Sequence, residues 1–460
     1  MLPSIFDAFV KASPVSVMAR GVMERFLNPD CLNAWFEEVS DKQYNRDLLF
    51  STLFDLLSQV VCGSHKSVHA AYQASPEDIG VSVVAVYDKL KRMEPQTSAA
   101  LVRYAASQAT PLIEALDGAQ ESLLPGYHVK LLDGNCLAAS EHRIKELRGI
   151  SSGPLPGKSL VVLDPSLRMP IDVFPCEDGH TQERALLNDV LETVEANDLW
   201  IADRNFCTRG FLNGIAEHEG YFIIRQHGNL PTEIVTPQSQ VGATETGRLY
   251  EQMVQITTQG GIVLPLRRIR VQLKSATRDG DRNIYILTNL PKRVNARKIA
   301  ELYRERWTIE TAFQDLTVHL RCEINTLGYP PAALLGFCVA LIAYITFAIL
   351  KAALQHVHGA EKIQEEFSGY YLADELGAVY RGMLIAVPAQ EWIIFRDMPC
   401  AHFVDLLIDL AREVNMRRFK KHPRKAKKKE PPRKKKSGQP HVSTARILAN
   451  RGSEKSGSTS

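Results

Sequence analysis

YHVKLLDGN, residues 127–135, and DLWIADRNF, residues 198–206, are the two stretches that decide the fold. Each begins as a short apolar run of the kind that forms a buried strand, and each run ends at an aspartate followed by polar residues. The aspartates are Asp133 and Asp203. Side chains at strand ends point into a shared crevice, so we expect the two carboxylates to lie near each other.

The residues around these stretches predict three strands, a helix, a strand, a helix and a strand. This is the order of elements found in ribonuclease-H-like folds, and it defines the first part of an α/β core, residues 121–228. Besides the two strands above, the candidates are strands at 158–164, 169–174 and 221–226, and helices at 181–196 and 211–219.

The composition changes after residue 228, where Thr, Gln, Val and Gly become frequent. We interpret residues 229–283 as a β-rich insertion, with strand candidates at 250–258 and 262–273. The core resumes at 284–360, beginning with the strand NIYILTNL at 283–290, and a long helix is expected from about Asn295 to Cys322. The predicted fold class is therefore α/β, with a ribonuclease-H-like core interrupted by the insertion.

An all-α domain, residues 1–120, is predicted before the core because its apolar residues recur at helical spacing. Two of its helices flank a turn at Ser75 and Pro76, and Ser82 stands as the N-cap of the second. A helix-turn-helix would have this pattern and would bring Lys89, Lys91 and Arg92 near DNA, but any pair of packed helices gives it too.

The carboxyl-terminal part contains an apolar run, PAALLGFCVALIAYITFAIL at 331–350, and a basic tail at 417–460. The run is long enough to span a bilayer, but it is single and its flanks lack a clear bias of positive charge, so we predict a buried core helix and no membrane contact. A helical region, 361–416, follows. Residues 417–436 carry 13 Lys or Arg against Glu430 and include three prolines, which predicts a disordered polycation. Its expected partner is nucleic acid phosphate, although such a run can also serve only solubility.

The eight cysteines are scattered without a CxxC pair, which favours reduced thiols over a disulfide framework or a zinc site. The first residues, MLPSIFDAFVKASP, lack the basic start and apolar run of a signal peptide. We therefore expect a cytoplasmic protein.

The third candidate acid lies in LYRERWTIETAFQDLTVHL, residues 302–320. On a continuous helix, Tyr303, Arg306, Glu310 and position 317 share one narrow stripe at the border of the apolar face. Such a stripe can face a ligand, whereas Arg306 and Glu310 can equally form an ordinary surface pair four residues apart.

These motifs resemble the bacterial insertion-sequence transposases of the DDE class, whose signature is Tyr, Arg, Glu and Lys at the spacings found here for Tyr303, Arg306 and Glu310. LLDGN and IADRNF resemble the two aspartate blocks of that family, 70 and then 107 residues separate the three acids, and the likeness covers roughly residues 127–327. Two features depart from it. Thr317 replaces the signature Lys, and no Trp occurs between residues 228 and 282, where relatives that form a DNA hairpin stack a flipped base.

The resemblance implies an enzyme that cuts insertion-sequence ends and joins them to target DNA, with two Mg²⁺ or Mn²⁺ ions held by Asp133, Asp203 and Glu310. Tyr303 and Arg306 would contact DNA phosphate, and Arg204 is a further candidate for DNA binding. The implied partners are double-stranded DNA, namely terminal inverted repeats and target, and a second copy of the chain, in the nucleoid of a bacterium. Two alternatives stay open: a ribonuclease-H-like nuclease without strand transfer, and a catalytically inactive DNA-binding derivative.

Overall fold

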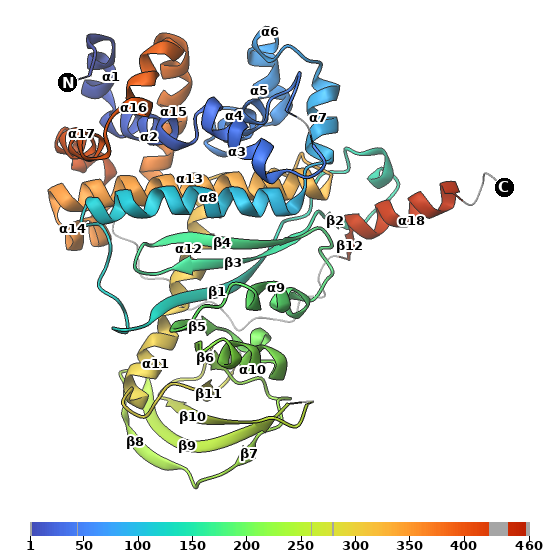
Figure 1. The fold of residues 1–460 in the computed structure, drawn as a ribbon, viewed down its shortest axis with the longest axis vertical. Helices are drawn as coiled ribbons and strands as arrows, with labels where there is room; N and C mark the ends of the chain where they lie inside the picture. The colour runs from blue at the N-terminus through green and yellow to red at the C-terminus, as the bar shows by residue number, and fades with distance from the viewer. Residues whose placement is uncertain (1, 44, 259, 278–279, 423–439, 457–460) are drawn as a thin grey trace.

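The computed structural model describes residues 2–43, 45–258, 260–277, 280–422 and 440–456. Its centre is a 10-stranded mixed sheet, covered at one end by a layer of helices and extended at the other by long antiparallel strands (Figure 1). The chain is thus a mixed α/β protein, as the sequence predicts.

The first half of the sheet contains the strands that the sequence predicts for the core. Its order is β4-β3-β1-β5-β6, in which β1, β5 and β6 run parallel and β3 runs antiparallel to both β1 and β4. The bounds are β1 (His128–Cys136), β3 (Lys158–Asp164), β4 (Met169–Cys176), β5 (Asp198–Ala202) and β6 (Tyr221–Arg225).

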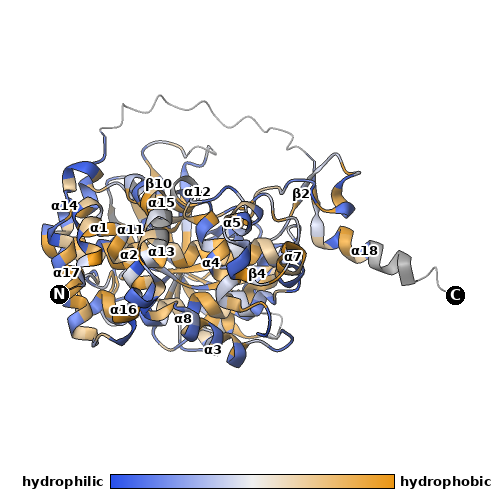
Figure 2. Ribbon diagram, turned by 90° about the horizontal axis from the view of Figure 1, so that it is seen from above, coloured by the Kyte–Doolittle hydropathy of each residue, from blue (hydrophilic) through white to orange (hydrophobic). Residues whose placement is uncertain are grey.

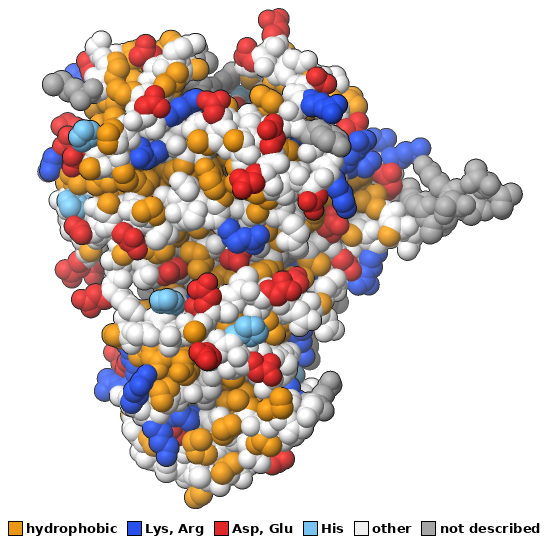
Figure 3. Space-filling view, in the orientation of Figure 1, with side chains coloured by type: hydrophobic (Ala, Val, Ile, Leu, Met, Phe, Trp, Pro, Cys, Tyr) orange, Lys and Arg blue, Asp and Glu red, His pale blue; other side chains and the backbone are white. Residues whose placement is uncertain are grey.

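The predicted insertion does not form a separate sheet. Strand β11 (Asn283–Thr288) pairs antiparallel with β6 on one side and with β10 on the other, so the inserted strands lengthen the core sheet. These strands are β7 (Glu233–Ile234), β8 (Ser239–Ala243), β9 (Gly247–Thr257) and β10 (Val263–Leu273). Hydrophobic side chains lie exposed over this end of the molecule (Figure 3), including Val241 and Val263.

Consecutive strand residues point to opposite sides of the sheet. Both sides of the central strands are buried. On β1, Leu132 packs toward α9 (Leu187–Leu191) and α10 (Arg209–Glu217), whereas Leu131 packs toward α11 (Ala296–Glu305). The helix predicted at 181–196 is shorter than expected: a 3₁₀ turn, η3 (Glu183–Leu186), precedes α9, and the chain leaves the helix after Leu191.

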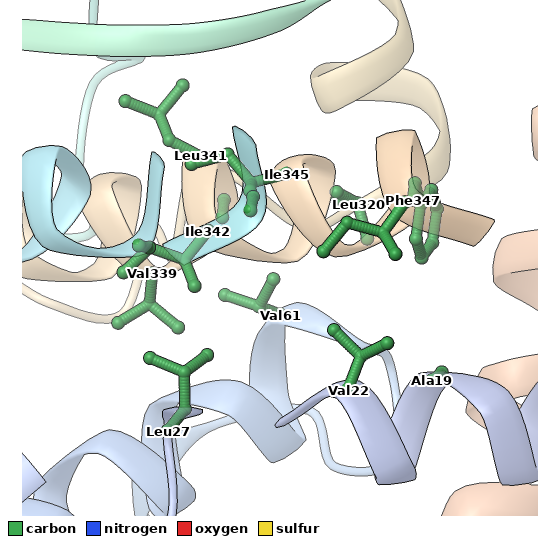
Figure 4. Close-up of a cluster of buried hydrophobic side chains, with 14 of the residues drawn as sticks. Ala19, Val22, Leu27, Val61, Leu320, Val339, Leu341, Ile342, Ile345 and Phe347 are labelled. Atoms are coloured by element: carbon green, nitrogen blue, oxygen red, sulfur yellow. The ribbon is translucent and has the colours of Figure 1, made fainter. Parts of the chain in front are cut away.

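The helical layer is built around α13 (Pro330–His358), which has the length and composition of a membrane span. It is hydrophobic along its length (Figure 2), and 89% of its most apolar stretch is buried inside the protein. In Figure 4, Val339, Ile342 and Ile345 of α13 lie beside Val22 and Val61 of two amino-terminal helices. This burial supports the prediction of a core helix.

Helices from both ends of the chain pack around α13 in one hydrophobic cluster. The domain boundaries at residues 120 and 360 stay a prediction. The helices are α1 (Asp7–Ala12), α2 (Pro14–Phe26), α3 (Pro29–Val39), α4 (Phe50–Val61), α5 (Val68–Ala74), α6 (Pro76–Ile79), α7 (Val83–Lys91), α8 (Pro95–Ala115), α14 (Ala360–Glu366), α15 (Gly369–Ala386), α16 (Ile393–Asp397) and α17 (Cys400–Arg412).

The disorder predicted for residues 417–436 is wrong for residues 417–422, the part of that run that the structure describes. A 3₁₀ turn, η6 (Met416–Phe419), is fixed by Arg418, which pairs with Glu375 at 2.8 Å. Farther on, β12 (His441–Ser443) pairs in parallel with β2 (Gly153–Leu155), and α18 (Thr444–Ser456) follows. Tertiary contacts hold these segments despite their polar composition; most of the basic run, residues 423–439, lies outside the described residues.

Candidate active site

Asp133 and Asp203 stand at the same level of the sheet. The last pair between the parallel strands β1 and β5 joins Leu132 to Ala202, so each aspartate is the next residue after that pair. The sequence prediction for Asp203 agrees with this position, directly after β5. The predicted end of β1 at Asp133 is wrong, because pairing with β3 continues as far as Cys136 and places Asp133 within the strand.

Both aspartates accept hydrogen bonds from the backbone that follows them. The Oδ1 of Asp133 accepts from the Gly134 N–H at 2.9 Å, and the Oδ1 of Asp203 accepts from the Asn205 N–H at 2.7 Å. Asp203 thereby caps the 3₁₀ turn η4 (Arg204–Phe206). These contacts fix the orientation of each carboxylate and leave its other oxygen for a second partner.

Glu310 reaches the site from a helix that begins next to it. The helix predicted from about 295 to 322 is in fact two helices, α11 and α12 (Trp307–His319), which meet at Arg306. The Nη1 of Arg306 lies 3.2 Å from Asp133 Oδ2 and 2.7 Å from Glu310 Oε1. One guanidinium therefore joins an acid of the sheet to an acid of the helix, which a surface pair four residues apart would not do.

Burial and mutual repulsion shape the electrostatics of the site. Burial raises the pKa of Asp133 to about 7, against the lowering effect of Arg306 and of the Gly134 N–H, and the charges of Asp203 and Glu310 raise it further. For Arg306, burial alone would lower the pKa, but Tyr303, Glu310 and Asp133 outweigh it and raise the pKa. The site thus holds more negative charge than Arg306 alone compensates.

Tyr303 lies at the carboxyl-terminal end of α11, half-buried beneath Arg306. Burial raises the pKa of its hydroxyl, which shares a hydrogen bond with Arg306. Thr317 is exposed on α12, and its hydroxyl donates to the Phe313 carbonyl at 2.9 Å. Three of the four positions of the signature are thus in or next to the site.

The structure also brings in Glu183, which the sequence reasoning missed. A Cβ atom built on Gly134 would lie 2.3 Å from Glu183 Oε1, so this carboxylate rests against β1 one residue beyond Asp133. Burial and the charge of Asp203 raise the pKa of Glu183. Its place in the first turn of a helix gave no signal, because acids are common there for reasons of helix electrostatics.

The remaining candidates for DNA binding lie apart from one another. Arg204 is exposed beside Asp203, whereas Lys89 and Arg92 are on α7, within the helical layer (Figure 1). Ser82 does cap α7, as predicted. Lys89 donates to the Leu48 carbonyl and stands 5.4 Å from the centre of the Phe36 ring, so its amino group is engaged within the protein. Arg92 is exposed at the end of α7.

Carboxylate oxygens are the ligands that Mg²⁺ and Mn²⁺ prefer, so the chemistry of the donors fits divalent metal ions. Within the described residues, however, no three His, Cys, Asp or Glu side chains lie close enough together to hold one ion. The reason is visible in the ion pairs: the guanidinium of Arg306 stands between Asp133 and Glu310.

Comparison with known proteins identifies the middle of the chain. Residues 156–345, which include Asp203 and Glu310, match the family described as "Transposase DDE domain". Residues 156–345 are thus similar to transposase DDE domains.

Two curated proteins are similar to part of this chain. One, "Putative transposase y4zB" of Sinorhizobium fredii, is 29% identical over 202 residues, 43% of this chain and 55% of that protein. The other, "Putative transposase for insertion sequence element IS4SA" of Synechocystis, is 21% identical over 179 residues, 37% and 47% of the two chains. The chain therefore spans about half the length of these relatives.

Among solved structures, the piggyBac transposase synaptic complex with hairpin DNA is similar at 12% identity and a TM-score of 0.37, over 85% of this chain and 84% of that one. This likeness is too low to assign residues of this chain.

Proposed function

We propose that this protein is a DDE transposase that cuts the ends of an insertion sequence and joins them to target DNA, using divalent metal ions held by Asp133, Asp203 and Glu310. The observation that carries the proposal is the arrangement of these acids. Asp133 and Asp203 each follow the last residue pair between the parallel strands β1 and β5, and Arg306 connects Glu310 to Asp133. The match to transposase DDE domains supports the same function.

The sheet supports a ribonuclease-H-like core. In the order β4-β3-β1-β5-β6, three parallel strands adjoin an antiparallel hairpin, and the first strand of the chain lies in the middle. Strand β1 lies between β3 and β5, so Asp133 lies near the centre of these strands, just past the point where β1 stops pairing with β5. That position lets acids from β5 and from α12 approach it from two directions.

When bound, two divalent ions would lower the pKa of the attacking water and stabilise the charge that develops on the phosphodiester. Asp133, Asp203 and Glu310 would hold the ions, and Glu183 would stand beside them. Glu310 can join Asp133 only after Arg306 releases the two carboxylates. Burial raises the pKa of Asp133 because it destabilises the ionised carboxylate, and a divalent ion bound there would supply positive charge in place of Arg306.

Arg306 would move from the two carboxylates to a DNA phosphate. Its guanidinium offers paired N–H donors that match two phosphate oxygens as well as they match a carboxylate. The hydrogen bond with Tyr303 would keep the guanidinium oriented during the exchange. Arg204 would contact the backbone of the same DNA. Arg92, in the helical layer, would make a second contact with DNA. We propose double-stranded DNA and a second copy of the chain as partners, in a bacterial nucleoid.

Glu310→Gln tests the proposal, since it removes one charge and preserves size and helix propensity. The variant should still bind DNA that carries both ends of the element but lose most nicking and joining with Mg²⁺. Glu301→Gln is the matched control, because Glu301 forms an exposed pair with Arg297 at the same spacing on α11. Both reactions are read from one gel assay.

Cleavage by Glu310→Gln at the parental rate would remove α12 from the active site. If the parent protein cleaves DNA without joining it, the protein is a nuclease. If the parent protein binds DNA without cleaving it, the protein is an inactive DNA-binding derivative.

A further inference from the structure

A large cavity lies on the far side of α12 from the acids. Its volume is about 1540 Å³, and its walls come from α12, α13, α14, the start of α15 and the turn between β3 and β4. Thr308, Thr311 and Ala312 of α12 line it, whereas Arg306 and Glu310 turn toward Asp133. Helix α12 therefore lies between the active site and this α12–α15 cavity.

Basic side chains predominate in the lining of the α12–α15 cavity. Five of its residues are Lys or Arg and three are Glu: Arg168, Lys298, Lys351, Lys420, Lys421, Glu121, Glu305 and Glu365. A ligand in the cavity thus meets more cations than anions, which favours a polyanion.

Aromatic rings stand among these cations. Phe367, Tyr344, Tyr370 and Tyr371 all line the cavity. Tyr370 is 49% exposed, and its ring lies 5.5 Å from that of Tyr371 in an edge-on arrangement. An exposed aromatic face beside Lys and Arg is what unpaired bases stack on when the cations hold the intervening phosphates.

We propose that the α12–α15 cavity binds a single-stranded segment of nucleic acid. A double helix, whose major groove alone is about 12 Å wide, presents its bases edge-on and cannot stack them on Tyr370. A single strand can turn its bases onto the tyrosines while Lys420 and Lys421 exchange their present partners, Glu366 and the Gln364 carbonyl, for its phosphates. Where the proposed transposase function holds, a strand freed at Asp133 would reach the cavity around α12.

The test measures binding of a labelled single-stranded oligothymidine of about ten nucleotides to the full chain, by fluorescence anisotropy without divalent metal. Tyr370→Ala should weaken binding about tenfold, the change expected for one lost base stack, and Tyr370→Phe should restore it. Lys421→Ala should reduce the salt slope of log K by about 0.7. Lys362→Ala is the control, because Lys362 is exposed on α14 outside the lining and should change neither value.

Parental binding by both Tyr370→Ala and Lys421→Ala would overturn the proposal, as would equal competition by a duplex of the same length. The result is separate from the proposed catalysis, because the assay contains no metal and Glu310→Gln should bind the oligothymidine as the parent does. Cleavage by Glu310→Gln at the parental rate would remove α12 from the proposed active site and leave the cavity result unaffected.

Discussion

Replacing Asp133 by Asn should stabilise the metal-free protein at alkaline pH. The side chain is 18% exposed, and burial raises its pKa from 3.8 to about 7. Its proton is therefore held more tightly in the folded than in the unfolded state. Above pH 7 the Asp133 carboxyl group ionises in the folded protein, which lowers the free energy of unfolding. Asn keeps the size and one acceptor for Arg306 but does not ionise, so this loss of stability is removed.

The magnitude follows from the shift. A difference of about 3 pH units corresponds to about 4 kcal/mol, an upper estimate because the native site can relax. The excess stability of Asp133→Asn should be small near pH 4, grow as the pH rises through the interval from about 4 to 7, and stay constant above 7. This sign is opposite to that of an aspartate whose folded pKa is depressed by an ion pair.

Urea unfolding at pH 6 and pH 8, in the presence of a chelator, measures the difference. Asp189→Asn, an exposed change on α9, should leave the free energy of unfolding unchanged at both pH values. Adding Mn²⁺ at 100 times its dissociation constant should stabilise the parent by about 2.7 kcal/mol and Asp133→Asn by much less. The reasoning fails if Asp133→Asn is no more stable than the parent at pH 8 without metal.

Three further predictions concern residues around the acids. Arg306→Ala should raise the affinity for Mn²⁺, measured by calorimetry, because Asp133 and Glu310 are released. The same variant should bind DNA more weakly. Unchanged metal affinity would show that Arg306 does not compete with the ions. Glu183→Gln should lower Mn²⁺ affinity about tenfold. Gly134→Ala should do the same, because its methyl group displaces the Glu183 carboxylate. Glu192→Gln, at an exposed residue just after α9, is the control and should leave the affinity unchanged. Replacing the nine Lys and Arg residues of 424–436 by Gln should reduce the salt slope of binding to double-stranded DNA by about 0.9 per lost phosphate contact, and an unchanged slope would make the run a solubilising segment.

The sequence alone determined the elements whose burial pattern is local. The run KSLVVLD predicted β3 with its observed bounds, and DLWIAD placed Asp203 directly after β5. The spacing of Tyr303, Arg306 and Glu310 placed these residues on one stripe, and Arg306 does pair with Glu310. The apolar run in α13 predicted a core helix. Each of these signals depends on the alternation or period of apolar residues within one segment, which one sequence displays directly.

The tertiary structure decided what depends on partners distant in the chain. Strand β1 continues past Asp133 because β3 supplies hydrogen-bonding partners as far as Cys136, and the predicted long helix divides at Arg306, whose side chain reaches back to the sheet. Glu183 enters the site only because its turn packs against Gly134. Residues 441–443, for which the sequence predicted no strand, form one because they pair with β2. Pairing energies between such segments exceed local propensity, and a single sequence does not state which segments will meet.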